Sequence, residues 1–136
     1  MGMDEFELEL LLDHYKDPRN FGHLNDPDVV REEGNPSCGD QIRMEFKLRG
    51  DVIEDVRFTG KGCAISQAAA SMLTEELKGK PLAEVRGWGK REMLDILGIE
   101  VNPMRLKCAL LALKVTKGAL FGETDWPNGD EAELAS

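Results

Sequence analysis

The sequence predicts an α+β domain in which a small antiparallel sheet has helices packed on it. Residues 41–49 alternate strictly between apolar and polar side chains, the pattern of a strand with one dry face. Gly50-Asp51 then turns the chain, and apolar side chains continue over residues 52–58. Outside this hairpin, the apolar residues recur mostly at helical spacing between Gly and Pro boundaries. Strands gathered in one segment and helices in others are typical of an α+β domain.

The N-terminal segment, residues 5–15, is predicted to be an amphipathic helix. Its apolar face is formed by residues at i, i+3, i+4 and i+7, namely Leu8, Leu11, Leu12 and Tyr15. Asp17-Pro18 ends this helix, because proline cannot continue it. The chain is turn-rich from there to Pro36, with a short strand expected around residues 29–30.

Residues 41–49 and 52–58 are predicted to pair as an antiparallel hairpin, which Gly60-Lys61-Gly62 ends. Four helices should follow. The first covers residues 64–78 and is closed by Gly79. Shorter helices are expected at about 81–88 and 91–97. Asn102 followed by proline then predicts the start of a long helix to about residue 120, whose core-facing residues include Leu106, Leu110, Leu113 and Leu120.

Length and charge limit the domain organisation and the class of partner. The chain has 136 residues and a formal net charge of −9, with five acids and no Lys or Arg in each of the segments 1–13 and 123–136. We therefore expect one domain over residues 1–122 and an acidic, loosely held tail over 123–136. No basic footprint for nucleic acid exists, and the longest apolar run, Cys108 to Leu113, is too short for a membrane span. No secretory signal is recognisable, so a cytoplasmic location is expected.

The three cysteines are the main candidates for functional residues. An odd number without a secretion signal argues against a disulfide framework. Cys38 precedes the first hairpin strand and Cys63 follows the second, so the hairpin brings both to the same end. Asp40, two residues after Cys38, can share that end. The sequence alone does not place Cys108, which falls in the second turn of the predicted last helix.

Ordinary structural roles compete with a site at these residues. A lone Cys is more often a small buried hydrophobe than a ligand. For Cys38 and Cys63 together, the shared hairpin end makes a ligand role and a buried structural role about equally favoured. The spacing lacks the CxxC pairs of zinc fingers. A catalytic Cys–His pair is conceivable, but nothing in the spacing connects His14 or His23 to a cysteine. Packing or capping roles are favoured for both histidines.

Four motifs in order resemble the NifU N-terminal-like iron–sulfur assembly scaffolds, the family that includes the IscU and SufU types. They are HYKDPRNFG at 14–22, NPSCGD at 35–40, GCAIS at 62–66 and Lys107-Cys108. The resemblance extends to about residue 121 and implies the SufE/NifU-like fold. It also implies a ligand set of Cys38, Asp40, Cys63 and Cys108. Three thiolates and a carboxylate suit zinc, and the same thiolates suit a [2Fe–2S] cluster.

The resemblance implies two functions. In the favoured one, the protein is a scaffold that accepts sulfur from a cysteine desulfurase, assembles a transient [2Fe–2S] cluster and passes it to apo-proteins. The alternative is a zinc-dependent sulfurtransferase of the SufU type, with zinc also expected in the cluster-free form. Cys108 is the predicted sulfur acceptor in both. A zinc-stabilised interaction domain without transfer chemistry is a third, less favoured hypothesis. A weak homo-oligomer is compatible with each.

Two departures from the family patterns bear on this choice. IscU-type members have a histidine before the last cysteine, where this chain has Lys107. That residue either attracts thiolate or persulfide charge or is an ordinary solvated lysine. SufU-type members have an extra segment between the second and third cysteines, and the 45 positions from Cys63 to Cys108 leave no room for it. The absent segment favours the scaffold, while Lys107 favours the sulfurtransferase.

Overall fold

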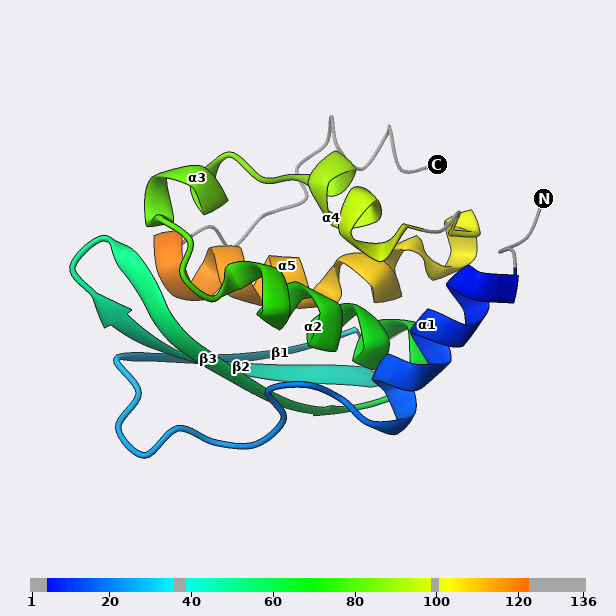
Figure 1. Cartoon of the computed structure of the whole chain (residues 1–136), viewed down its shortest axis with the longest axis horizontal. Helices are drawn as coiled ribbons and strands as arrows, with labels where there is room; N and C mark the ends of the chain where they lie inside the picture. The colour runs from blue at the N-terminus through cyan, green and yellow to red at the C-terminus, as the bar shows by residue number, and fades with distance from the viewer. Residues whose placement is uncertain (1–4, 36–38, 99–100, 123–136) are drawn as a thin grey trace.

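The computed structural model describes residues 5–35, 39–98 and 101–122, and it confirms the α+β class (Figure 1). Three strands and five α-helices are present in this part of the chain. In order they are α1 (Glu5–Lys16), β1 (Val29–Asn35), β2 (Asp40–Arg49), β3 (Val52–Lys61), α2 (Ala64–Leu77), α3 (Leu82–Arg86), α4 (Lys90–Leu97), the 3₁₀ turn η1 (Pro103–Arg105) and α5 (Leu106–Phe121). No helix of the described residues is both long and apolar enough to cross a membrane.

The sheet has the order β1-β2-β3 and is antiparallel throughout. Its inner face is apolar because alternate residues of β2 and β3 point to the same side. These side chains are fully buried, and each contributes about 1.5–3 kcal/mol by leaving water; they are Ile42, Met44, Phe46, Ile53, Val56 and Phe58. The predicted hairpin is therefore confirmed as the centre of the core.

Helices α2 and α5 lie across the inner face of the sheet (Figure 1). The Ala68–Ala70 run of α2 is fully buried, and its small side chains let the helix approach closely. Helix α5 buries three of the four predicted core residues, Leu106, Leu110 and Leu113, while Leu120 packs against the core from its edge. Helix α1 packs on α2, and α3 and α4 lie on the far side of the helical layer (Figure 1).

Residues 17–28, here called the strap, cross the outer face of the sheet, opposite the helices (Figure 1). At one end Gly22 N–H donates to Phe58 O (2.8 Å) and Phe58 N–H donates to Asn20 O (2.9 Å), along the free edge of β3. At the other end Asp28 N–H donates to Phe46 O (2.8 Å), where β1 begins. The turn-rich composition of this segment thus encodes a covering loop.

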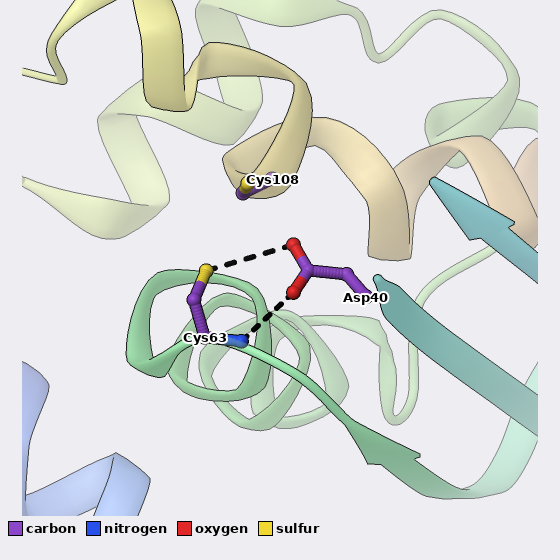
Figure 2. Close-up of side chains that lie close together, drawn as sticks. All are labelled: Asp40, Cys63 and Cys108. Carbon is purple, nitrogen blue, oxygen red and sulfur yellow. Dashed lines mark hydrogen bonds between the residues drawn. The ribbon is translucent and has the colours of Figure 1, made fainter. Parts of the chain in front are cut away.

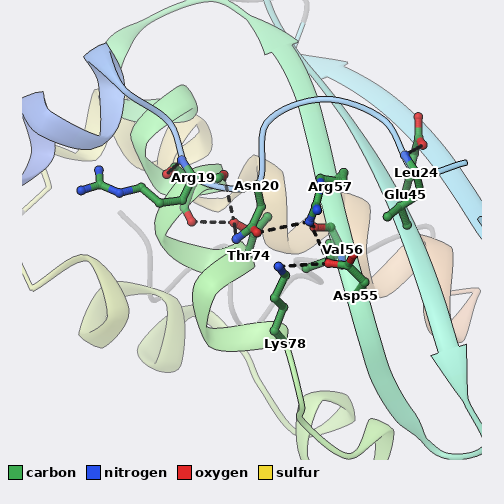
Figure 3. Close-up of polar contacts among 10 residues, drawn as sticks. Arg19, Asn20, Leu24, Glu45, Asp55, Val56, Arg57, Thr74 and Lys78 are labelled. Atoms are coloured by element: carbon green, nitrogen blue, oxygen red, sulfur yellow. Dashed lines mark hydrogen bonds and ion pairs between the residues drawn. The ribbon is translucent and has the colours of Figure 1, made fainter.

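Asn20 connects the strap to the helical layer. It has a φ of 56°, which a non-glycine residue adopts rarely. Its amide Nδ2 donates to Thr74 Oγ1 of α2 (3.1 Å), and its Oδ1 accepts from Arg57 of β3 (3.3 Å) (Figure 3). Arg57 also donates to Asp55 (2.8 Å). The left-handed backbone at Asn20 is thus held by side-chain bonds to two elements.

Three details differ from the sequence predictions. Strand β1 spans seven residues, Val29–Asn35, rather than a short stretch at 29–30. Tyr15 was expected on the buried face of α1 but is 43% exposed, and His14 is buried instead. The last long helix begins at Leu106 after a 3₁₀ turn, so Cys108 lies in its first turn rather than its second.

Candidate metal centre

Three ligand-type side chains converge where β2, α2 and α5 meet. Asp40 is the first residue of β2, Cys63 is the N-cap of α2, and Cys108 is the third residue of α5. One ligand atom from each lies within 4.8 Å of the other two. Figure 2 shows the carboxylate of Asp40 and the sulfur of Cys63 facing each other, with Cys108 above them. No other group of three such residues meets this criterion in the described part of the chain.

The Asp40 carboxylate is held by Cys63. Its Oδ1 accepts a hydrogen bond from the Cys63 backbone N–H at 2.8 Å, and its Oδ2 accepts one from the Cys63 thiol at 3.5 Å (Figure 2). Asp40 is 1% exposed. Because Cys63 caps α2, the carboxylate lies at the positive end of that helix, which favours its negative charge. The sequence prediction that Asp40 and Cys63 share one end of the hairpin is confirmed.

The two described cysteines differ in exposure. Cys63 is half-buried, whereas Cys108 is 2% exposed. The Cys63 side chain makes no capping hydrogen bond to α2, so its sulfur is directed to Asp40 rather than to the helix backbone. Helix α5, which the sequence could not place, brings Cys108 to the other two groups. Lys107, its neighbour in sequence, is exposed.

The donor set fits a soft or borderline metal ion. Two thiolates and a carboxylate are ligands that zinc accepts in tetrahedral sites, and thiolates also bind the iron of [2Fe–2S] clusters. The predicted fourth ligand, Cys38, lies outside the described residues and stays a prediction. It is two residues from Asp40 in the sequence, and the flanking residues Asn35 and Gly39 are joined by a backbone hydrogen bond of 2.9 Å.

Neither histidine belongs to this cluster. His14 Nδ1 lies 2.7 Å from Ser71 Oγ and its Nε2 lies 3.5 Å from Glu75. Burial lowers the pKa of His14 below its usual value, and nearby Arg19 lowers it further. His23 Nδ1 lies 2.6 Å from Glu45 Oε2 on the outer face of the sheet. The packing role favoured from the sequence is therefore confirmed for His14, whereas His23 is exposed and pairs with Glu45, and the described residues contain no Cys–His pair.

Gly62 is the residue whose part in the site the sequence analysis missed. The sequence identified it as part of the hairpin end and of the GCAIS motif without a role at the site, yet the structure places it directly against the Asp40 carboxylate. The available signal was the pair of glycines in Gly60-Lys61-Gly62-Cys63, because glycine before a candidate ligand often marks a close backbone approach.

Comparison with known proteins decides the family. Residues 7–123 match the family described as the NifU-like N terminal domain. The chain belongs to this family. It is 40% identical to the zinc-dependent sulfurtransferase SufU of Bacillus subtilis, over 89% of this chain and 93% of that one. It is also 40% identical to the iron–sulfur cluster assembly scaffold protein IscU of Aquifex aeolicus, over 82% of this chain and 72% of that one.

A solved structure supports the same fold and family. The crystal structure of FiSufU from Fervidobacterium islandicum AW-1, named for iron–sulfur cluster assembly in the SUF system, superimposes with a TM-score of 0.73. The two chains are 32% identical, and the match covers 82% of this chain and 94% of that one. The SufE/NifU-like fold implied by the sequence motifs is thus confirmed.

The aligned lengths do not separate the two kinds of relative. The match to the SufU of Bacillus subtilis extends over 138 positions but includes only 89% of this 136-residue chain, so that protein has residues there that this chain lacks. The match to the IscU of Aquifex aeolicus extends over 114 positions and includes 82% of the chain, which requires few such residues. The match to the IscU of Thermotoga maritima extends over 128 positions and also includes 82% of the chain, so extra residues occur in an IscU relative as well.

Proposed function

We propose that this protein is an iron–sulfur cluster assembly scaffold. The observation that carries the proposal is the convergence of Asp40, Cys63 and Cys108 from three elements, in a family whose relatives include cluster assembly scaffolds. The cluster is the cargo rather than a resident cofactor. An oxygen ligand binds soft iron less firmly than thiolate does, so Asp40 supplies a weak point from which a finished [2Fe–2S] cluster is released to an apo-protein.

The sulfur-transfer step uses one of the thiolates. The acceptor sulfur attacks the terminal sulfur of a persulfide on a cysteine desulfurase, the S–S bond breaks, and its electron pair stays on the desulfurase cysteine. Each transferred sulfur then needs two electrons from an external donor to become sulfide. We propose Cys108 as acceptor, in which case the desulfurase must displace the first turn of α5, because this thiol is 2% exposed. Half-buried Cys63 is the competing acceptor.

The second candidate is the zinc-dependent sulfurtransferase. It is favoured by the 40% identity to SufU over most of both chains and by a donor set that suits zinc. In that case the protein holds Zn²⁺ through Cys38, Asp40, Cys63 and Cys108, and one thiol is freed to accept persulfide sulfur. Both functions have a cysteine desulfurase as partner. Both also require reduced thiols, which places them in the cytoplasm.

Anaerobic reconstitution separates the two functions. The protein is incubated with iron(II), cysteine, a cysteine desulfurase and a thiol reductant, and visible absorption and metal content are measured. We expect a chromophore with about two irons per site, since a [2Fe–2S] cluster contains that number, and transfer of the chromophore to an apo-ferredoxin. Retained zinc, absence of a chromophore and faster desulfurase turnover would instead establish the sulfurtransferase.

A pair of single variants identifies the acceptor. Cys108→Ser and Cys63→Ser each remove one thiol of the same site, so both should weaken metal binding. Mass spectrometry after a short exposure to desulfurase and cysteine should then show one added sulfur atom on Cys63→Ser and none on Cys108→Ser. The opposite result would show that Cys63 is the acceptor, and it would not contradict the proposed metal site.

A further inference from the structure

The backbone of Gly62 lies against the Asp40 carboxylate at the opening of the metal centre. A Cβ atom built on Gly62 would lie 2.1 Å from Asp40 Oδ1 and 2.8 Å from both Asp40 Cα and Cγ. Side chains do not tolerate such distances, so any residue other than glycine must displace Asp40 or the end of β3. The φ of Gly62 is +130°, which L-residues rarely adopt.

Gly62 differs in this respect from the other glycines with positive φ. Among the described residues these are Gly22, Gly39, Gly50, Gly79, Gly98 and Gly122, and a Cβ on any of them would meet nothing within 4 Å. Their backbone conformation alone accounts for glycine at those positions. At Gly62 a second requirement is added, because the missing side chain leaves the space that a ligand carboxylate occupies.

The position of the carboxylate determines which oxygen faces the thiols. With Asp40 against the Gly62 backbone, Oδ1 accepts the Cys63 N–H (2.8 Å) and Oδ2 faces the Cys63 sulfur (3.5 Å). We propose that Gly62 is a positioning residue for the metal centre: its missing side chain seats Asp40 with Oδ1 on the Cys63 amide, and Oδ2 is thereby presented to the metal. This inference rests on the metal site of the proposed function and adds a requirement for a residue that is not a ligand.

Metal binding should be sensitive to the position of the Asp40 carboxylate, because metal sites tolerate little change in ligand distance. Ligand distances in metal sites are held to about 0.2 Å, while a Cβ at Gly62 forces a displacement several times larger. A group that orients a ligand typically costs about 10–100-fold in metal affinity when it is lost. Gly62→Ala should therefore act on the metal as though the Asp40 ligand were missing.

Cobalt(II) is the probe for the test, because its d–d absorption bands report the ligands in a tetrahedral site. Each full-length protein is titrated anaerobically with Co²⁺ alone. The set comprises the unmodified chain, Gly62→Ala, Asp40→Ala and Gly79→Ala. Gly79→Ala is the matched control, since it adds a side chain at positive φ in open space, beyond the end of α2 that is opposite the metal centre.

We expect Gly62→Ala to lose about 10–100-fold in Co²⁺ affinity and to show the d–d spectrum of Asp40→Ala. Gly79→Ala should retain the spectrum of the unmodified chain. If Gly62→Ala and the unmodified chain bind Co²⁺ equally, the positioning role is wrong and the metal site stands. If the unmodified chain binds no Co²⁺, the metal site and the positioning role are both wrong.

The double variant Asp40→Ala/Gly62→Ala distinguishes positioning from a general loss of structure. In the Asp40→Ala background the contacts of the added Cβ with Oδ1 and Cγ are absent and only the backbone contact with Cα remains, so adding Gly62→Ala should cost less Co²⁺ affinity than it does in the unmodified chain. If Gly62→Ala lowers the Co²⁺ affinity of Asp40→Ala as much as it lowers that of the chain with Asp40 present, the proposal is wrong. Should Gly62→Ala alone fail to fold, recovery of the folded circular dichroism spectrum in the double variant supports the proposal. A double variant that stays unfolded overturns it.

Discussion

Strand β2 carries two buried carboxylates that serve different ends. Asp40, at its start, points to the inner side with the core residues and is 1% exposed; Glu45, five residues on, points to the outer side and is 2% exposed. The Glu45 carboxylate accepts hydrogen bonds from the Leu24 amide (2.9 Å) and the Arg43 guanidinium (3.0 Å) and lies 2.6 Å from His23 Nδ1. Asp40 instead faces the amide and thiol of Cys63.

The difference lies in what balances the negative charge. Burial by itself raises the pKa of Glu45, but the bonds from His23, Leu24 and Arg43 outweigh it and lower the pKa below its usual value. That carboxylate is stabilised by groups built into the fold, and it holds the strap in place. The neighbours of Asp40 include a ligand-type thiol and a helix N-terminus, and in the proposed metal centre a cation takes the place of the thiol proton. The Glu45 carboxylate holds the strap, and the Asp40 carboxylate is one of three ligand-type groups that lie together.

The largest expected effect comes from exchanging each carboxylate for its amide. Asp40→Asn keeps an acceptor for the Cys63 N–H but removes the anionic ligand. Zinc affinity should fall by more than about 100-fold, since losing a mere orienting group already costs about 10–100-fold. Competition with a chromophoric chelator measures it. Glu45→Gln is the matched control, and an equal loss of zinc affinity there would break the distinction between the two carboxylates.

Removing the Glu45 side chain should act on stability instead. Glu45→Ala leaves the strap amide of Leu24 and the Arg43 guanidinium without their acceptor, at a cost of about 2 kcal/mol in the free energy of unfolding. Urea unfolding of the metal-free protein measures this. The metal-free Asp40→Asn protein should lose less. If the two variants unfold at the same urea concentration, the strap does not depend on Glu45 in the way proposed.

A smaller effect is expected on how the free energy of unfolding depends on pH. The folded-state pKa of His14 lies below its usual value of 6.5, so the unfolded chain binds the proton first and stability falls as pH drops below about 7. Asp13, Arg19, Ser71 and Glu75 surround this imidazole. Unfolding free energies between pH 7 and pH 5 should decline in the unmodified protein and be flatter in His14→Gln. The contribution of Glu45, whose pKa is lowered from 4.5, should be lost only at lower pH. Equal slopes in both proteins would contradict the assignment.

The smallest effect is expected at Lys107. Its side chain is exposed, so Lys107→Ala should change the unfolding free energy by no more than about 0.5 kcal/mol. Zinc affinity should stay within about twofold, the equivalent of that energy. The rate of persulfide uptake is the informative measurement. A tenfold slower uptake at unchanged zinc affinity would show that this lysine attracts the anionic sulfur and is more than a solvated side chain.

The sequence predicted the hairpin and α2 because their apolar periodicity is strong, and it therefore placed Asp40 and Cys63 together. It underestimated β1, since this strand lacks an apolar face. Arg31 and Glu33 of β1 instead pair with each other, Arg31 lies against Gly118, and Glu33 also pairs with Lys114. An edge strand packed through polar side chains gives no period-two signal of hydrophobicity.

Two other features depended on tertiary contacts. Periodicity favoured Tyr15 for the buried face of α1, but the hydrogen bond between His14 Nδ1 and Ser71 Oγ favours burial of His14. The place of Cys108 follows from how α5 packs on the sheet, which no local pattern encodes. The motifs predicted which residues form the ligand set, and the structure shows that three of them, Asp40, Cys63 and Cys108, lie together. For Gly62 the pair of glycines before Cys63 indicated a close backbone approach, but only the fold shows that the approaching group is the Asp40 carboxylate.

The three residues of the candidate metal centre come from segments far apart in the chain, since Cys63 lies 23 positions after Asp40 and Cys108 lies 45 positions after Cys63. A cation held by all three is a removable crosslink between the sheet, α2 and α5. Clips that close long loops reduce the entropy of the unfolded chain, and a ligand at 100 times its dissociation constant adds about 2.7 kcal/mol to the folded state. Delivery of the cargo therefore leaves behind a looser protein, and its susceptibility to proteases becomes a measure of whether it is loaded.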